Sequence, residues 1–214
     1  MSLYTRWVIA TVGAAVAGYL LTLPIYRHAA DLGLGDRFTQ WQAAAGLIEL
    51  VVYVLVTYWA LAPVFPKLRA ARYAALTILP TLILLVLLAM LDADIHGAAG
   101  SAAPPADAPG EDSIIAALIA APFLLLATWG LFSLQWLSLS EAAEGYWPWV
   151  GWAIAGTVAA YGLALFVEQS LGSSPYADLS TAGRQASVYL YAVAISSLFG
   201  IVSGIGVARL RPKP

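Results

Sequence analysis

Residues 114–137, IIAALIAAPFLLLATWGLFSLQWL, run for 24 positions without a charged side chain. An α-helix needs about 20 predominantly apolar residues to cross the hydrocarbon core of a bilayer. A run of this length and composition is therefore typical of a transmembrane helix.

Five other segments have a similar length and composition, and they lie on both sides of this one. The six predicted spans are Trp7–Tyr26, Trp41–Leu61, Tyr73–Leu91, Ile114–Leu137, Trp147–Val167 and Val188–Val207. Their apolar residues are continuous, whereas barrel strands are short and alternate. We expect an all-α fold: a polytopic integral membrane protein with six transmembrane helices in one bundle, forming a single domain over residues 1–214.

The composition of the chain agrees with this class. Hydrophobic residues make up 61% and charged residues 10% of the 214 positions, and the mean hydropathy is +0.81. Soluble domains are about 45–50% apolar and about 25% charged, so the expected partner is the lipid bilayer. The net charge of -2 does not indicate nucleic-acid binding. The absence of cysteine excludes disulfides and thiolate metal sites.

The distribution of Lys and Arg predicts the orientation, because cytoplasmic loops carry an excess of both. With the N-terminus inside, seven of the ten cations face the cytoplasm: Arg6, Lys67, Arg69, Arg72, Arg209, Arg211 and Lys213. The segment 92–112 has no cation and five acids, and its Ala, Gly and Pro content predicts a flexible outward loop. Both termini are thus predicted to be cytoplasmic, and the Ala-rich, Lys-poor composition suggests the cell membrane of a prokaryote.

Glu49 is the one charged residue inside the six predicted spans. An ionisable group at that depth is costly unless it faces the bundle interior, becomes neutral or pairs. Helical spacing places it in one polar stripe, which consists of Gln42, Gly46, Glu49, Tyr53 and Thr57. Glu49 is interpreted either as a neutral interhelical hydrogen-bonding group or as the site of a mobile proton or cation. In the second case Gln42, Tyr53 and Thr57 line the path of the solute.

Small residues recur at every fourth position in the first and last spans. The two rows are Ala10, Ala14 and Gly18, and Ser196, Gly200 and Gly204. Such rows allow helices to approach closely in a membrane. They indicate either packing within the bundle or docking to another membrane subunit or to a second copy of the chain.

Asp92, Asp94 and His96 follow the third span in the stretch LDADIH, and in an extended segment they would share one side. Carboxylates with an imidazole could hold Zn, Mn or Fe, although the spacing matches no specific metal motif. The alternative is that the stretch is simply where a helix leaves the membrane. A haem held by His28 and His96 is disfavoured, because no predicted span contains a histidine.

Motifs for enzyme chemistry are missing from the sequence. Ser203 in GIVSG resembles a nucleophile turn, but no histidine follows it. The patterns of zinc proteases, P-loops and dinucleotide sites are absent, so the chain is not expected to be an enzyme and its cofactors stay open. Three hypotheses remain: a small solute or cation transporter, an accessory subunit of a membrane complex, and an interfacial enzyme that uses the Asp92, Asp94 and His96 cluster.

Overall fold

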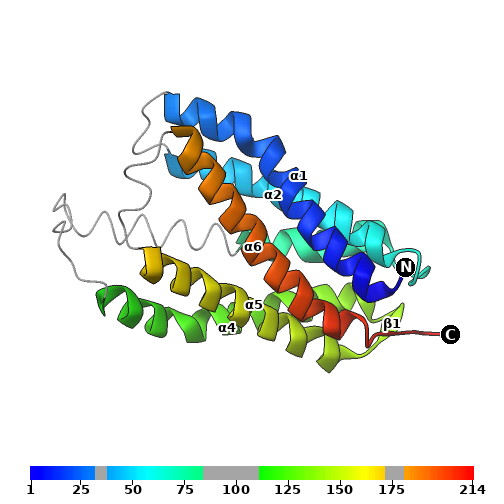
Figure 1. Cartoon of the computed structure of the whole chain (residues 1–214). Coiled ribbons are helices and arrows are strands. Elements are labelled where there is room, and N and C mark those ends of the chain that lie inside the picture. Colours follow the sequence, from blue (N-terminus) through cyan, green and yellow to red (C-terminus); the bar gives the residue numbers. More distant parts are fainter. Residues whose placement is uncertain (32–37, 84–110, 172–180) are drawn as a thin grey trace.

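The computed structural model describes residues 1–31, 38–83, 111–171 and 181–214 (Figure 1). The helices there are α1 (Leu3–Asp31), α2 (Phe38–Leu61), the unlabelled helix Ala70–Ile83, α4 (Glu111–Leu139), α5 (Tyr146–Leu171) and α6 (Thr181–Val207). Two strands of two residues each, β1 (Ala143–Glu144) and β2 (Arg211–Pro212), complete the elements. The predicted all-α class is confirmed.

The helices extend beyond the apolar runs from which they were predicted. Helix α6 begins at Thr181, seven residues before the predicted start at Val188, and α5 continues to Leu171. The helices are longer than the predicted spans because hydropathy locates only the part of a helix that suits lipid. Backbone hydrogen bonds continue through polar flanking residues, where hydropathy gives no signal.

One helix within the described ranges meets the test for a membrane span by length and composition alone, namely α1 over Leu3–Ile25. Shorter apolar helical stretches occupy Ala45–Leu61, Ala70–Ile83, Leu125–Leu139 and Val193–Val207. A long apolar helix near an N-terminus is also typical of a signal sequence. The number of membrane spans therefore stays a prediction.

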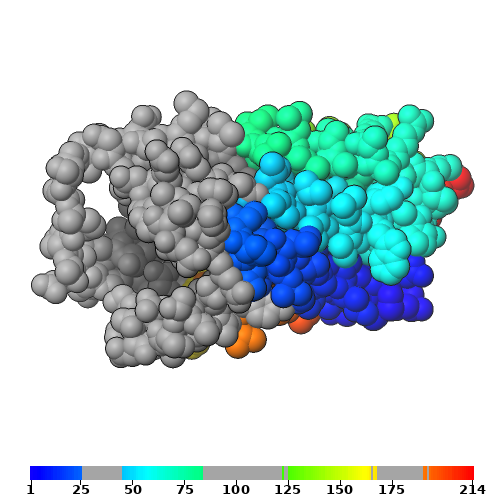
Figure 2. Space-filling view, turned by 90° about the horizontal axis from the view of Figure 1, so that it is seen from above, coloured from blue at the N-terminus to red at the C-terminus, as the bar shows by residue number. Residues whose placement is uncertain are grey.

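The helices are joined in a ring that follows the order of the sequence. Helix α1 packs against α2 and α6, and α5 packs against α4 and α6. The helix Ala70–Ile83 links α2 to α4, because the Tyr73 hydroxyl donates to Thr57 and accepts from Gln135. Figure 1 shows α6 between α1 and α5, where it closes the ring. In Figure 2, α1 and α2 lie side by side on one face.

Both termini lie at one end of the bundle, together with β1 (Figure 1). The C-terminal segment returns to the turn between α4 and α5, where β2 pairs antiparallel with β1. The Lys213 amide extends this pairing by donating to the Ala142 carbonyl, at 2.9 Å. Gly145, with φ of +119°, then turns the chain into α5. Hydropathy gave no sign of these strands, because each is only two residues long.

The hydrophobic core is concentrated near this same end. Trp7 of α1 and Trp149 of α5 pack edge to face, with ring centroids 5.5 Å apart and planes at 71°. The Trp7 indole also donates to the Ser203 hydroxyl of α6, at 2.9 Å. Edge-to-face pairs are favoured by the charge distribution of aromatic rings. The core thus fixes α1, α5 and α6 relative to one another, and α1 and α2 continue from it toward Glu49.

Candidate functional site

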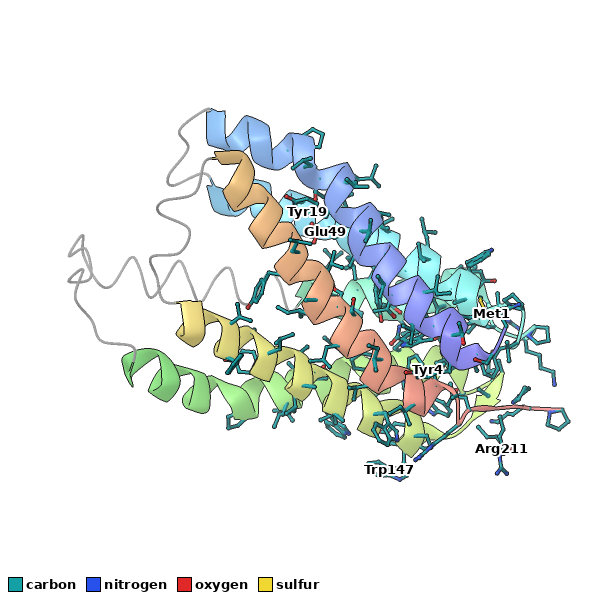
Figure 3. All side chains as sticks on the ribbon, viewed as in Figure 1. Met1, Tyr4, Tyr19, Glu49, Trp147 and Arg211 are labelled. Carbon is teal, nitrogen blue, oxygen red and sulfur yellow. The ribbon has the colours of Figure 1, made fainter. Side chains whose placement is uncertain are left out.

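Glu49 of α2 lies opposite Gly18 of α1, where the two helices approach closely. A Cβ built on Gly18 of α1 would be 3.1 Å from the Glu49 Cγ and 3.4 Å from its Cα. The glycine therefore lets the backbone of α1 approach the side chain of Glu49. Figure 3 shows Glu49 with Tyr19, away from the end of the bundle where Met1, Tyr4 and Arg211 lie. The site is thus built by a close helix crossing.

A threonine of α1 supplies the hydrogen-bonding partner of the carboxyl group. The Thr22 hydroxyl lies 2.9 Å from Oε1 of Glu49, and it is fully buried. The Thr22 hydroxyl is also within hydrogen-bonding distance of two carbonyls of its own helix, those of Gly18, at 3.1 Å, and Tyr19, at 3.2 Å. A hydroxyl has one proton to donate, so it cannot serve all three acceptors at once.

This shared proton makes the site compatible with both forms of the acid. When Glu49 is ionised, Thr22 donates to Oε1. When Glu49 is protonated, the acid donates to the Thr22 oxygen, and Thr22 donates to the Gly18 carbonyl. The heavy atoms need not move between the two arrangements. The two hydrogen-bonding arrangements therefore differ only in the orientation of hydroxyl groups.

Glu49 also faces a cavity of about 440 Å³ that lies between α1, α2, α5 and α6. Half of the residues that line it are apolar, namely Ala14, Ala15, Leu50, Ala160, Ile195 and Phe199. The other half are polar, namely Thr11, Tyr19, Glu49, Tyr53, Thr157 and Ser196. Its volume is within the range of small-molecule sites, roughly 300–1,000 Å³.

Two of the polar groups of the lining are already used within their own helices. The Thr11 hydroxyl donates to the Trp7 carbonyl at 2.9 Å, and the Thr157 hydroxyl donates to the Ala153 carbonyl at 3.0 Å. Glu49 is the single carboxylate in the described lining. The charge that a ligand would meet in the cavity is therefore concentrated at one point.

A second, smaller cavity of about 170 Å³ lies on the other side of Tyr53. Leu50, Tyr53 and Phe199 line both cavities and form the wall between them. The smaller cavity extends to Thr77, Thr81 and Gln135, which come from the helix Ala70–Ile83 and from α4. The two cavities are thus separate, with Leu50, Tyr53 and Phe199 between them.

A buried cluster of hydrogen bonds borders the smaller cavity. Gln135 donates from Nε2 to the Tyr73 hydroxyl at 3.0 Å and to the Thr77 hydroxyl at 3.1 Å. The Tyr73 hydroxyl donates to Thr57 at 3.0 Å, and Thr57 donates to the Tyr53 carbonyl at 2.6 Å. Buried polar groups need such partners to offset the loss of water. This cluster fixes the wall that contains Tyr53.

The residues of the predicted polar stripe do not all lie at the large cavity. Glu49 and Tyr53 line the large cavity, and Thr57 belongs to the buried cluster around Tyr73. Gln42 lies in α2, but its side chain is outside the described residues. The structure therefore brings together Glu49 and Tyr53 at the cavity and separates Thr57 from them.

The two small-residue rows lie inside the bundle. Ala10 and Ala14 are buried, and Gly18 contacts α2 at Glu49. On α6, a Cβ built on Gly200 would be 2.9 Å from the Thr11 Cβ, and one on Gly204 would be 3.1 Å from the Tyr4 ring. Ser196 lines the large cavity. These rows are used for contacts within one chain.

The predicted metal cluster cannot be placed. Asp92, Asp94 and His96, with the rest of the predicted outward loop up to residue 110, lie outside the described residues. The side chain of His28 lies outside them as well. Among the described side chains, no group of three or more His, Asp or Glu residues could hold a metal ion. Ser203 is buried and accepts from Trp7, in agreement with a packing role.

Sequence reasoning missed most of the residues around Glu49. Thr22 and Phe199 lie in apolar runs and carry no separate signal in the sequence. Helical periodicity within one segment identified Glu49 and Tyr53, but it carries no information on which residues of other helices face them. A threonine four residues after a glycine was the available signal, because Thr can bond to the carbonyl four residues earlier.

No family model, curated protein or solved structure matches the chain.

Proposed function

We propose that this chain is a six-helix membrane protein that binds a small solute or cation at Glu49 and transports it across the bilayer. The observation that carries the proposal is the position of Glu49, which among the described lining residues is the single carboxylate facing a cavity of about 440 Å³ inside the ring of helices. Transporters place their substrate and ion sites at helix interfaces near the bilayer midplane.

The lengths of the helices support a membrane location. Helices α1, α2, α4, α5 and α6 contain between 24 and 29 residues. At about 1.5 Å per residue, even 24 residues extend about 36 Å, which exceeds the bilayer core of about 30 Å. Large apolar side chains are exposed on several of them, including Leu55, Trp59, Leu126, Phe166 and Leu190. Lipid would cover a surface of this kind.

The position of Glu49 along α2 agrees with a site near the midplane. It lies twelve residues before the end of the helix at Leu61 and eleven after its start at Phe38. The distances along the helix axis are therefore about 18 Å and about 16 Å. A carboxylate at such a depth is retained where it has a partner or a function.

The charge distribution supports the proposed orientation, with both termini cytoplasmic. The termini and the turns 62–69 and 140–145 lie at one end (Figure 1), which also has the predicted inward cations. The chain has no cysteine, so single cysteines can be labelled without background. In intact cells, an impermeant maleimide should label Ser101→Cys and leave Glu144→Cys unlabelled. The reverse pattern would overturn the orientation.

Transport by Glu49 can be tested in liposomes that contain the purified chain and a pH-sensitive dye. A gradient of Na⁺, K⁺, methylammonium, guanidinium or glycine is applied, and proton movement is recorded. We expect at least one of these probes to exchange for protons in the wild type and not in Glu49→Gln. Glu144→Gln, at the exposed residue of strand β1, is the matched control and should behave as wild type. Equal exchange by wild type and Glu49→Gln would contradict the proposal.

The alternative functions have less support. An accessory subunit would need docking surfaces other than the two small-residue rows, because Ala10, Ala14, Gly200 and Gly204 are buried inside the chain. The hypothesis of an interfacial enzyme depends on Asp92, Asp94 and His96, which lie outside the described residues. Transport is therefore the function that the described residues favour.

A further inference from the structure

The size of the large cavity favours a ligand larger than a metal ion at Glu49. A water molecule occupies about 30 Å³ in the liquid, so a cavity of about 440 Å³ has the volume of about fifteen waters. A metal ion bound at Glu49 would leave most of this volume to water in contact with the apolar side chains of Leu50, Ile195 and Phe199. A ligand with an apolar body would use that surface instead.

The chemistry of the lining also disfavours a metal ion. Ca²⁺ takes six to eight oxygen ligands, and Mg²⁺ demands a nearly ideal octahedron. The described lining contains one carboxylate and no histidine, and the hydroxyls of Thr11 and Thr157 donate to carbonyls of their own helices. One carboxylate can instead pair with one ammonium group, since an N–H donor bonded to a carboxylate forms a strong, charge-assisted hydrogen bond.

Aromatic side chains add a second attraction for such a group. Tyr19, Tyr53 and Phe199 all line the cavity. The faces of aromatic rings attract cations, more strongly where water is excluded. A positively charged nitrogen near Glu49 would therefore be favoured by the carboxylate and by these rings together.

We propose that the ligand of this cavity is a small organic ammonium ion, that is, a protonated amine with an apolar body. Its N–H donates to the Glu49 carboxylate, and its apolar part contacts Ala14, Ala160 and Phe199. This inference rests on the proposed transport function and specifies its substrate class. In the absence of the amine, a proton takes its place on Glu49, and the acid then donates to Thr22. One carboxylate therefore holds either a proton or the amine, which is the arrangement needed for exchange.

The test uses the purified full-length chain in detergent, with 2-phenylethylammonium as the probe and binding measured by calorimetry. The neutral analogue 2-phenylethanol and the ions Na⁺ and Mn²⁺ are compared with it. We expect the ammonium to bind and the alcohol to bind at least tenfold more weakly. Glu49→Gln should reduce the affinity for the ammonium by roughly tenfold or more, because a charge-assisted hydrogen bond is lost.

A second variant leaves the carboxylate in place and tests the role of the apolar wall. Ala160→Leu adds three carbons to the lining of the cavity and should also reduce binding of 2-phenylethylammonium by roughly tenfold, because it fills the space for the apolar body. Glu144→Gln should not change the affinity. Equal binding of the amine and the alcohol, or binding that Glu49→Gln does not change, would overturn the inference.

The outcomes separate this inference from the proposed function. If Na⁺ or Mn²⁺ binds in a manner that depends on Glu49 and the ammonium does not, the substrate class is wrong while transport at Glu49 stands. If the liposome assay shows no exchange that depends on Glu49, the transport function itself fails. Binding of the ammonium that depends on both Glu49 and Ala160 supports the substrate class.

Discussion

The Thr22 hydroxyl of α1 and Oε1 of Glu49 on α2 are 2.9 Å apart, and the threonine is fully buried. The hydroxyl hydrogen-bonds the carboxyl directly. Because its oxygen is also close to two carbonyls of its own helix, it can either donate to the acid or accept from it. Variants of Thr22 therefore test this hydrogen bond directly.

Replacing Thr22 by Val should remove this partner while keeping the shape of the side chain. The infrared C=O stretching band of protonated Glu49, identified by its loss in Glu49→Gln, should shift to higher frequency in Thr22→Val, because the O–H of the acid loses the hydroxyl oxygen to which it donates. Thr22→Ser retains the hydroxyl and should restore the position of the band. An unchanged band in Thr22→Val would show that the hydroxyl does not interact with the acid.

Gly200→Ala should destabilise the protein, because the new Cβ would lie 2.9 Å from the Thr11 Cβ across the α1–α6 contact. Forcing an extra carbon into a close-packed contact costs about 1–3 kcal/mol. The control is Gly13→Ala, where a Cβ meets no other residue within 4 Å. Thermal unfolding in one detergent should give a lower Tm for Gly200→Ala than for Gly13→Ala. Equal Tm values would contradict the close packing of α1 on α6.

Tyr73→Phe should also lower the stability, through hydrogen bonding rather than packing. The variant removes the hydroxyl that lies between Thr57 and Gln135. Leaving buried polar groups without a partner costs about 1–3 kcal/mol. Tyr58→Phe is the control, since its hydroxyl makes one long contact of 3.4 Å to the Leu68 carbonyl. A smaller loss of unfolding free energy in Tyr73→Phe than in Tyr58→Phe would count against the cluster.

Gly145→Ala tests the turn that leads into α5. The residue has φ of +119°, a conformation that side-chain-bearing residues rarely adopt, and a Cβ there would lie 3.2 Å from the Leu210 Cδ2. Strain of this kind costs about 1–3 kcal/mol. Gly151→Ala, in α5 with nothing within 4 Å of the new Cβ, is the control. Its Tm should equal or exceed that of wild type, whereas the Tm of Gly145→Ala should fall.

The helices were predictable because a long apolar run without charge has few structural alternatives. Their ends were not, since polar residues such as Thr181 continue α6 without any hydropathy signal. Glu49 was identifiable because it is an ionisable residue inside an apolar predicted span, where burying a charge is costly. Thr22 was not, because its partner lies 27 residues away on another helix. The return of the tail to β1 depends on long-range pairing of two-residue strands, for which a local pattern holds no information.

The hydrogen bond from Trp7 to Ser203 joins residues that are 196 positions apart. At a synthesis rate of roughly 5–20 residues per second, Ser203 would leave the ribosome roughly 10–40 s after Trp7. During this interval the helices that precede α6 lack their contacts with it, and the cavity at Glu49 lacks the wall that α6 provides. A nascent chain would therefore carry its carboxylate in an open bundle. The site is complete only after α6 has been synthesised and has docked against α1.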